Sequence, residues 1–467
     1  MLSFFPDKIA KRALYTYLGV LLVVSAAFIS HVMALPFLVI GVMWVSLFFL
    51  STAYCSKKWL NLPERKLMGR LFVTALSLRV AWALFSYFFY IWHTGIPFEF
   101  SPGDSLWYYD ESVANANANI VDVFRYLFVD TDSVSDSGYV FYLSLLTHLT
   151  GESVLLPRLV NCLFSAATCC LVYRLAQRNI GEAGGRLAAI MCCFMPNLIY
   201  YCGLHLKEAF MLFVLVAYLE RVDDMLRRRK IKVWNALLVL FLAAYLFCFR
   251  TVLGAAALFA LVTALFFSST QMMGRTKRTM VIIWALLAVF TLMGGTIQNE
   301  IQSTWEERAD NQVRKREVQT ARGNQWAKYA TGTVLAPMMF VMPFPTMVDV
   351  DEQYNQQVVS GGNYVRNFLG GFVLIALFTA IFVRKNWRNF ALIGAFAIAY
   401  LGIVSTSGFA NSERFLLPAL PALLILASYG VTQLNAKTYR FLKIWYWIVP
   451  LMAIGWAFFK LGSRGLF

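Results

Sequence analysis

Long apolar segments recur along almost the whole chain and are separated by short polar loops. A helix that crosses the hydrocarbon core of a bilayer, about 30 Å thick, needs roughly 20 predominantly apolar residues. Several segments reach this length, and they do not alternate between apolar and polar residues as the strands of a transmembrane barrel do. The pattern predicts an all-α polytopic membrane protein. Its transmembrane helices, about 13 in number, are expected near residues 13–30, 34–54, 71–92, 153–173, 187–202, 206–221, 234–249, 251–268, 279–296, 367–383, 389–405, 415–432 and 443–460.

The composition and the placement of charge agree with this prediction. Of the 467 residues, 59% are hydrophobic and 14% are charged, whereas a soluble domain carries roughly 25% charged residues. The net charge of +16 does not indicate a nucleic-acid partner, because the basic residues gather in short loops between apolar segments. Such loops face the cytoplasm in membrane proteins. We therefore expect a multi-pass protein of the bacterial inner (cytoplasmic) membrane, with its N-terminus inside. The loops expected on the cytoplasmic side are 56–70, 174–186, 222–233, 271–278, 384–388 and 435–443.

The same pattern divides the chain into four parts. Two N-terminal transmembrane helices occupy residues 1–55, and a transmembrane core at 71–296 contains a first outer loop at 93–138. A long outer loop follows at 297–366, and further transmembrane helices occupy 367–460.

Some segments are expected to lie at the outer membrane surface rather than to cross the bilayer. Residues 137–151 are amphipathic but too short to span, which predicts a helix in the interface next to the first outer loop. Residues 333–346 are apolar but carry three prolines, which favours a re-entrant or interfacial stretch. The basic loop 308–328 is assigned no role. The eight cysteines show neither a metal-type spacing nor a disulfide framework.

The first candidate for chemistry is the acidic stretch "SPGDSLWYYDES" at the start of the first outer loop. It fits a helix start with Ser101 as N-cap, Pro102 at N1 and Asp104 at N3, so the carboxylate could serve only as a cap. Asp104, Tyr108 and Glu111 follow i, i+4, i+7 spacing and share one helix face. A carboxylate held there could accept a proton from an attacking hydroxyl group. The two roles do not exclude each other.

A second candidate is the short outer turn "YYCGLHLKEAF". His205, Lys207 and Glu208 lie within it, between two apolar segments. Ionisable groups at such depth are functional candidates, although a lysine can also simply extend to the membrane surface.

Two further cations are expected at the outer ends of helices. Arg250 stands alone in "LFCFRTVLG", and Arg414 follows Glu413 in "NSERFLLPALP". The positive-inside rule places few basic residues on this side. A guanidinium group binds phosphate with two parallel hydrogen bonds, so Arg250, Arg414 and Lys207 suit a lipid phosphate.

These segments, in this order, resemble the integral-membrane glycosyltransferases of the GT-C fold. That group includes the protein mannosyltransferases and the lipid A aminoarabinose transferase. The resemblance runs from about residue 72 to residue 430 and rests on "GDSLWYYDES", on the paired helices and short turn that end in "GLHLKEAF", on "FRTVLGAAALF" and on "ERFLLPALPALLILASYG".

The resemblance implies a reaction and a set of roles. The enzyme would move a sugar from a polyprenyl-phosphate carrier to a hydroxyl acceptor on a glycan, a lipid or a protein, at the outer face of the membrane. Asp104 would be the catalytic carboxylate, and Lys207, Arg250 and Arg414 would hold the lipid phosphate. Contacts to donor or acceptor would come from Tyr108, Glu111, His205, Glu208 and Glu413. Some members of the group use a divalent cation, and no ligand spacing in this sequence requires one.

Two other functions fit parts of the pattern. A surface-polysaccharide polymerase or ligase also has many helices, a long outer loop and outer arginines, and the basic loop 308–328 would suit it. A lipid-linked sugar flippase or transporter would bury charges in the middle of its helices, whereas here the charges gather at helix ends.

Overall fold

The computed structural model describes residues 2–129, 134–228, 232–267, 344–350, 353–406 and 413–462, and every regular element within these ranges is a helix. The predicted all-α class is thereby confirmed. The helices of the first half are α1 (Asp7–Ala27), α2 (Leu35–Lys58), α3 (Glu64–Thr94), α4 (Gly103–Ala116), α5 (Ile120–Phe128), α6 (Ser137–Thr150), α7 (Leu155–Phe194), α8 (Pro196–Tyr200), α9 (Glu208–Arg227), α10 (Val233–Phe247) and α11 (Thr251–Phe267). Those of the second half are α16 (Tyr354–Val358), α17 (Ser360–Phe378), α18 (Ala391–Thr406), α19 (Glu413–Leu416), α20 (Leu420–Thr432) and α21 (Ala436–Gly462).

Eight helical segments in the described ranges are long and apolar enough to cross a membrane. They correspond to α1, α2, α3, α7, α17, α18, α19 with α20, and α21. Two shorter apolar helices, α10 and α11, accompany them. These lengths and compositions indicate a membrane protein, but they do not establish the count of about 13. The predicted helix at 279–296 lies outside the described residues.

The helix α7 covers most of the transmembrane segment predicted at 153–173, the loop predicted at 174–186 and the first half of the segment predicted at 187–202. Its 40 residues include a break at Gly181, where φ is 83°. This left-handed conformation is costly for residues with a Cβ atom, and it interrupts the helix. Next to the break, the guanidinium group of Arg186 donates to the backbone oxygens of Trp59 and Leu62 at 2.9 and 2.7 Å. The second half of α7 is thereby tied to the connection between α2 and α3.

The core of the bundle is built around α7, which packs against α2, α3, α9 and α20, while α17 packs against α2, α20 and α21. A buried arginine, Arg79 in the middle of α3, supports this centre. Its guanidinium group donates to the backbone oxygens of Cys193 and Cys192 at 3.1 and 3.2 Å and to Ser165 at 2.7 Å. Backbone oxygens at the end of a helix lack partners within it, and Pro196 prevents α7 from continuing. Arg79 therefore satisfies this helix end, which gives a charge in the middle of a helix a structural role.

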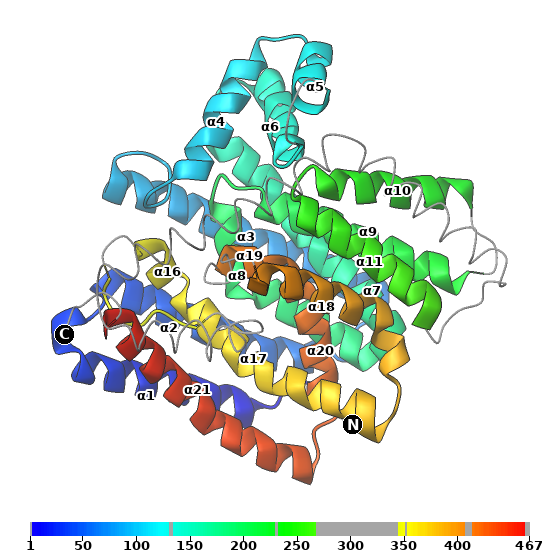
Figure 1. Cartoon of the computed structure of the whole chain (residues 1–467). Coiled ribbons are helices and arrows are strands. Elements are labelled where there is room, and N and C mark those ends of the chain that lie inside the picture. The colour runs from blue at the N-terminus through cyan, green and yellow to red at the C-terminus, as the bar shows by residue number, and fades with distance from the viewer. Residues whose placement is uncertain are drawn as a thin grey trace.

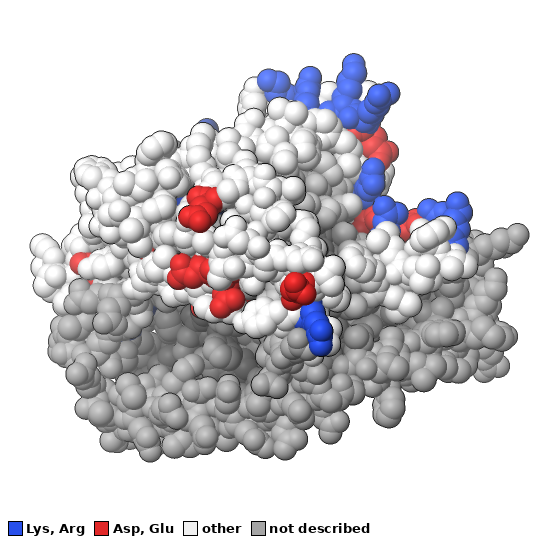
Figure 2. Space-filling view, turned by 90° about the horizontal axis from the view of Figure 1, so that it is seen from above, with Lys and Arg blue, Asp and Glu red and all other residues white. Residues whose placement is uncertain are grey.

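The first outer loop is largely helical. In Figure 1, α4, α5 and α6 project from the bundle and run across the direction of the long helices. The helix α6 coincides with the predicted interfacial segment at 137–151 and packs on α4. Figure 2 looks down on this side of the molecule and shows separate acidic side chains across the face, with basic side chains gathered along one edge.

The long outer loop predicted at 297–366 lies mostly outside the described residues, including 308–328 and nearly all of 333–346. Its last part differs from the prediction. The helix α17 begins at Ser360, seven residues before the expected start at 367. The prediction placed this turn in the outer loop, yet its polar side chains Asn363 and Arg366 are buried inside the bundle. The helix buries them among other parts of the protein, so their polarity does not mark an exposed segment.

None of the eight cysteines, all of which lie in the described ranges, forms a disulfide.

Candidate functional site

The start of α4 differs from the predicted cap. Ser101 adopts a left-handed conformation with φ 53°, Pro102 takes the N-cap position, and no side chain caps the helix. The helix begins at Gly103, so Asp104 is its second residue rather than its third. The carboxylate of Asp104 instead forms an ion pair with Arg414, from the distant helix α19. The prediction that Ser101 caps the helix was wrong, because the backbone at Ser101 is left-handed and the helix begins one residue later than expected.

Arg414 joins two carboxylates that come from opposite parts of the chain. One nitrogen of its guanidinium group contacts Asp104 on α4, and another contacts Glu208, the first residue of α9. Glu208 also accepts from Arg250 at 3.1 Å. Arg250 in turn lies over the ring of Phe415 at 4.2 Å and donates to the hydroxyl of Tyr400 at 3.4 Å. The four charged groups therefore form one chain of ion pairs that runs from the surface into the bundle.

Lys207 belongs to a neighbouring branch. Its ammonium group forms an ion pair with Asp136 and donates to the backbone oxygen of Phe249 at 2.8 Å. Asp136 also accepts a hydrogen bond of 2.9 Å from the hydroxyl of Tyr108. The protein therefore holds this ammonium group in place with contacts on two sides.

We call these six charged residues the pocket-side network: Asp104, Asp136, Lys207, Glu208, Arg250 and Arg414. Its three cations and three carboxylates balance. The side chain of Asp104 is 62% exposed, whereas that of Glu208 is fully buried. Asp104 is therefore the most exposed member of the network, and the Asp136 side chain is 32% exposed at the end of the other branch.

An open pocket of about 330 Å³ lies beside this network. Asp104 and Arg414 line it, together with Glu99 and Glu413. The hydroxyl of Tyr201 donates to Glu413 at 3.0 Å and fixes that carboxylate from behind. The pocket is thus lined by three carboxylates and one guanidinium group.

The other predicted site residues lie elsewhere. His205 is buried between the rings of Phe98 and Tyr109, whose centres are 6.0 and 6.1 Å from its own. Burial lowers the pKa of His205 to about 3. Glu111 is half-buried on α4, and its carboxylate has no ion pair among the described residues. Neither residue lines the pocket.

Two acidic residues that sequence reasoning did not single out belong to the site. Asp136 precedes α6 with φ 72°, in the "DSG" turn, a residue pattern that can signal a left-handed position. Glu99 lies in the connection from α3 to α4, where burial raises the pKa of its carboxyl group and Ser105 donates to it at 2.5 Å. No local signal distinguishes Glu99 from the other acidic residues of the loop.

The site does not resemble a metal centre. Among the described residues, no three His, Cys, Asp or Glu side chains are grouped closely enough to hold a metal ion. The carboxylates of the network are instead held by arginine and lysine. We therefore derive no step through a divalent cation.

Comparison with known proteins adds no family to this description. The chain matches no protein-family model and no curated protein. A functional assignment consequently depends on the geometry of the site and on the order of the sequence segments.

Proposed function

We propose that the protein is a membrane glycosyltransferase of the GT-C type. It would move a sugar from a polyprenyl-phosphate carrier to a hydroxyl acceptor on a glycan, a lipid or a protein. The observation that carries the proposal is the position of Asp104, an exposed carboxylate at the edge of a pocket and in contact with a cation that leads into a buried ion-pair network. Such a site combines a proton acceptor with positive charge, and transfer from a phosphate requires both.

The geometry supports a direct displacement. The acceptor oxygen would attack the anomeric carbon while the bond from that carbon to the phosphate oxygen breaks. Asp104 would take the proton of the attacking hydroxyl group. Arg414 would stabilise the charge that develops on the departing lipid phosphate, because a guanidinium group matches phosphate oxygens.

The ion pairs of the network imply an order in which the donor phosphate binds Arg414 first and Asp104 is released afterwards. Arg414 is already engaged by Asp104 and Glu208, so a phosphate must compete for its guanidinium group. Asp104 is the exposed partner and Glu208 the buried one, so the phosphate would replace Asp104. Donor binding would thereby release the carboxylate to act as the base. Lys207 and Arg250, each held by a carboxylate, would supply further positive charge from behind.

The remaining parts of the proposal concern the membrane. We propose about 13 transmembrane helices, with the pocket on the outer side of the bacterial inner membrane. The arrangement of charge supports this sidedness, since most of the basic side chains visible in Figure 2 gather at one edge, whereas several acidic side chains are spread across the rest of the face.

Two alternative functions, a surface-polysaccharide polymerase or ligase and a lipid-linked sugar flippase, are examined by the same experiment. The basic loop 308–328, which favoured a polymerase or ligase, lies outside the described residues. Charge in the middle of a helix would favour a flippase, and Arg79 has that position. However, Arg79 is committed to backbone oxygens at the end of α7.

The test uses the full chain reconstituted in vesicles with polyprenyl-phosphate sugars and candidate acceptors. We expect transfer by the wild type and at least a 100-fold loss of kcat in Asp104→Asn, since general bases contribute roughly 10²–10⁴-fold. Glu152→Gln, which changes an exposed carboxylate outside the pocket, is the matched control. Full transfer by Asp104→Asn would contradict the mechanism. Movement of the lipid-linked sugar across the bilayer without transfer would favour the flippase.

A further inference from the structure

The pocket contains an excess of hydrogen-bond acceptors. One oxygen of Glu99 and the amide oxygen of Asn355 are buried and have no hydrogen-bond partner among the described residues. The second oxygen of Glu413 is also buried without a hydrogen bond of ordinary geometry, although the side chains of Asn363 and Arg366 lie near this carboxyl group. All three residues line the pocket. Glu99 and Glu413 are 6% and 7% exposed, so bulk water does not supply the missing donors freely.

In each of these three side chains, one polar atom forms a hydrogen bond with the protein and the other does not. Ser105 donates to the first oxygen of Glu99, and Tyr201 donates to the first oxygen of Glu413. The amide nitrogen of Asn355 donates to the backbone oxygen of Phe100. The side chains are therefore held in position while their second oxygens stay unpaired. A buried acceptor without a partner is costly, and buried polar groups in proteins are normally paired.

The charge of the pocket restricts what can supply the donors. Glu99, Asp104 and Glu413 line it with carboxylates, and Arg414 is the one arginine or lysine among its described lining residues. Arg414 is itself paired with two carboxylates. A phosphate bound deep in this pocket would find no described lining cation other than Arg414, which two carboxylates already hold. The groups are too dispersed for a metal ion, since no described cluster qualifies. A neutral group with several hydroxyl donors fits both restrictions.

We propose that this pocket binds a sugar ring through its hydroxyl groups, with Glu99, Glu413 and Asn355 as the residues that determine specificity. The pocket volume of about 330 Å³ falls at the lower end of the range of roughly 300–1,000 Å³ for small-molecule sites. The phosphate of a lipid-linked donor would stay outside, at Arg414. Sugar binding is a claim about this pocket alone, and only the role of the bound sugar, donor or acceptor, rests on the proposed function.

The first experiment measures binding without turnover. Saturation-transfer NMR on the full chain in detergent micelles would compare a panel of neutral hexoses and pentoses with glucosamine and glucose 6-phosphate. We expect saturable binding of neutral sugars, competition among them, and weaker binding of glucose 6-phosphate than of glucose. Binding of glucosamine alone would show that the pocket selects an ammonium group and would overturn the proposal. Absence of binding by the whole panel, or preference for the phosphate, would also overturn it.

Variants then assign the effect to the pocket. Glu99→Gln keeps an oxygen that can accept from Ser105 but removes the negative charge. We expect binding to weaken about 10- to 100-fold in Glu99→Gln and in Glu413→Gln, since hydrogen bonds to charged groups contribute about that factor. Glu152→Gln is the control and should bind as the wild type does. A thermal melt of each variant separates lost binding from lost folding. Unchanged binding by both folded variants would refute the assignment.

Transfer assays separate this inference from the proposed function. If the sugar of the donor occupies the pocket, Glu99→Gln raises the KM for the lipid-linked donor. If the acceptor occupies it, the KM for a glycan acceptor rises instead. Asp104→Asn lowers kcat in either case. Sugar binding without any transfer would defeat the proposed function and leave the pocket assignment standing. Sugar transfer with wild-type KM values by both Glu99→Gln and Glu413→Gln would defeat the pocket assignment and leave the proposed function standing.

Discussion

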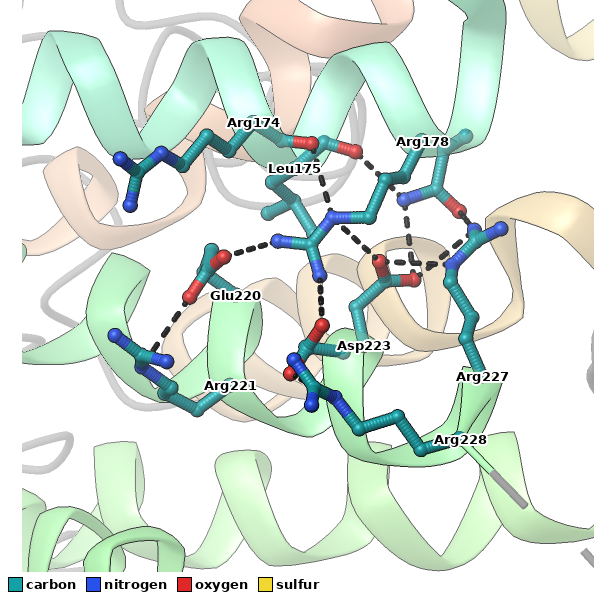
Figure 3. A network of polar contacts seen from close by, with 10 residues as sticks. Arg174, Leu175, Arg178, Glu220, Arg221, Asp223, Arg227 and Arg228 are labelled. Carbon is teal, nitrogen blue, oxygen red and sulfur yellow. Dashed lines mark hydrogen bonds and ion pairs between the residues drawn. The ribbon is translucent and has the colours of Figure 1, made fainter. Parts of the chain in front are cut away.

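The two ends of α9 carry polar networks of opposite design. Glu208, at its first residue, belongs to the pocket-side network. About 28 Å further along the helix, estimated from its rise per residue, Arg227 closes a second network at the other end. We call this second group the basic-end network, and it consists of Arg178, Glu220, Arg221, Asp223, Asp224, Arg227 and Arg228 (Figure 3).

The basic-end network is local and redundant. Arg178 on α7 faces three carboxylates of α9, with Asp223 at 3.5 Å and Asp224 at 3.3 Å in addition to Glu220. Each of these carboxylates also contacts a second arginine, which lies on α9 or directly after it (Figure 3). The pairs join one helix to itself or to one neighbour. Loss of a single contact leaves the other contacts in place.

The pocket-side network joins residues that are far apart in the sequence, and Arg250 and Lys207 each have a single carboxylate partner among the described residues. Arg414 is separated from Glu208 by 206 residues and from Asp104 by 310. Glu208 is the one described carboxylate that pairs with Arg250, and Asp136 is the one that pairs with Lys207. This network also reaches a pocket lined by residues with unpaired oxygens, whereas each carboxylate of the basic-end network contacts two arginines of that network. The difference indicates that one end fixes the packing of α7 on α9 and the other is arranged to exchange a partner.

The largest effect is expected from Glu208→Gln. This change leaves Arg250 and Arg414, whose side chains are 9% and 16% exposed, without the carboxylate that they share. Removal of one partner from a buried ion pair costs about 3–5 kcal/mol. We expect a large fall in the melting temperature in detergent and loss of sugar transfer. A variant that melts like the wild type would show that the pocket-side network has substitutes for Glu208.

An acid-dependent loss of stability should arise at the same end of α9, from His205. Burial lowers the pKa of the folded form to about 3, from an ordinary value of 6.5. Between these values the unfolded chain binds a proton that the folded protein does not, so stability falls as the pH decreases below 6.5. At pH 5 the loss is about 2 kcal/mol, since one pKa unit corresponds to about 1.4 kcal/mol. Melting curves at pH 7 and pH 5 measure it.

The matched variant for this effect is His205→Phe, which keeps an aromatic ring between Phe98 and Tyr109. The melting temperature of the variant should change less between pH 7 and pH 5 than that of the wild type. An equal change in both proteins would assign the acid sensitivity to other groups.

A smaller effect is expected from Glu220→Gln at the basic end. Glu220 is buried, as Glu208 is, but Arg178 keeps Asp223 and Asp224 as partners. We expect a loss of about 1 kcal/mol and unchanged sugar transfer. The comparison with Glu208→Gln is the direct test of redundancy, because both variants remove the charge of a buried glutamate on the same helix. A loss as large as that of Glu208→Gln would remove the distinction between the two ends.

The contrast between the two networks also explains how far the sequence could predict the structure. The apolar segments predicted the helices, because transfer of apolar side chains out of water depends on composition and length, which are local. Two of the basic-end pairs, Asp223 with Arg227 and Asp224 with Arg228, follow the four-residue spacing that brings helical side chains together. Local rules therefore suffice for most of the bundle and for these two pairs, whereas the contacts of Arg178 depend on the packing of α7 on α9.

The pocket side required information that local rules do not contain. Asp104, Glu208, Arg250 and Arg414 were chosen as outer charged residues, and the structure places them in one network. Their pairing depends on the packing of α4, α9 and α19, which no spacing reveals. Glu99 and Asp136 were missed for the same reason, since each is one of several acidic residues in a single loop. The functional roles of these residues stay predictions until transfer is measured.

The smallest effect is expected from Arg228→Gln, which breaks the most exposed ion pair of the basic-end network. Arg228 is 47% exposed and contacts Asp224, four residues before it, at 2.7 Å. Asp224 keeps Arg178 as a partner after the change, and exposed pairs of this kind contribute little to stability. We expect no resolvable change in melting temperature and normal sugar transfer. If Arg228→Gln destabilised the protein as much as Glu220→Gln, the contacts at this end would be cooperative, and each arginine would be needed to hold α9 against α7.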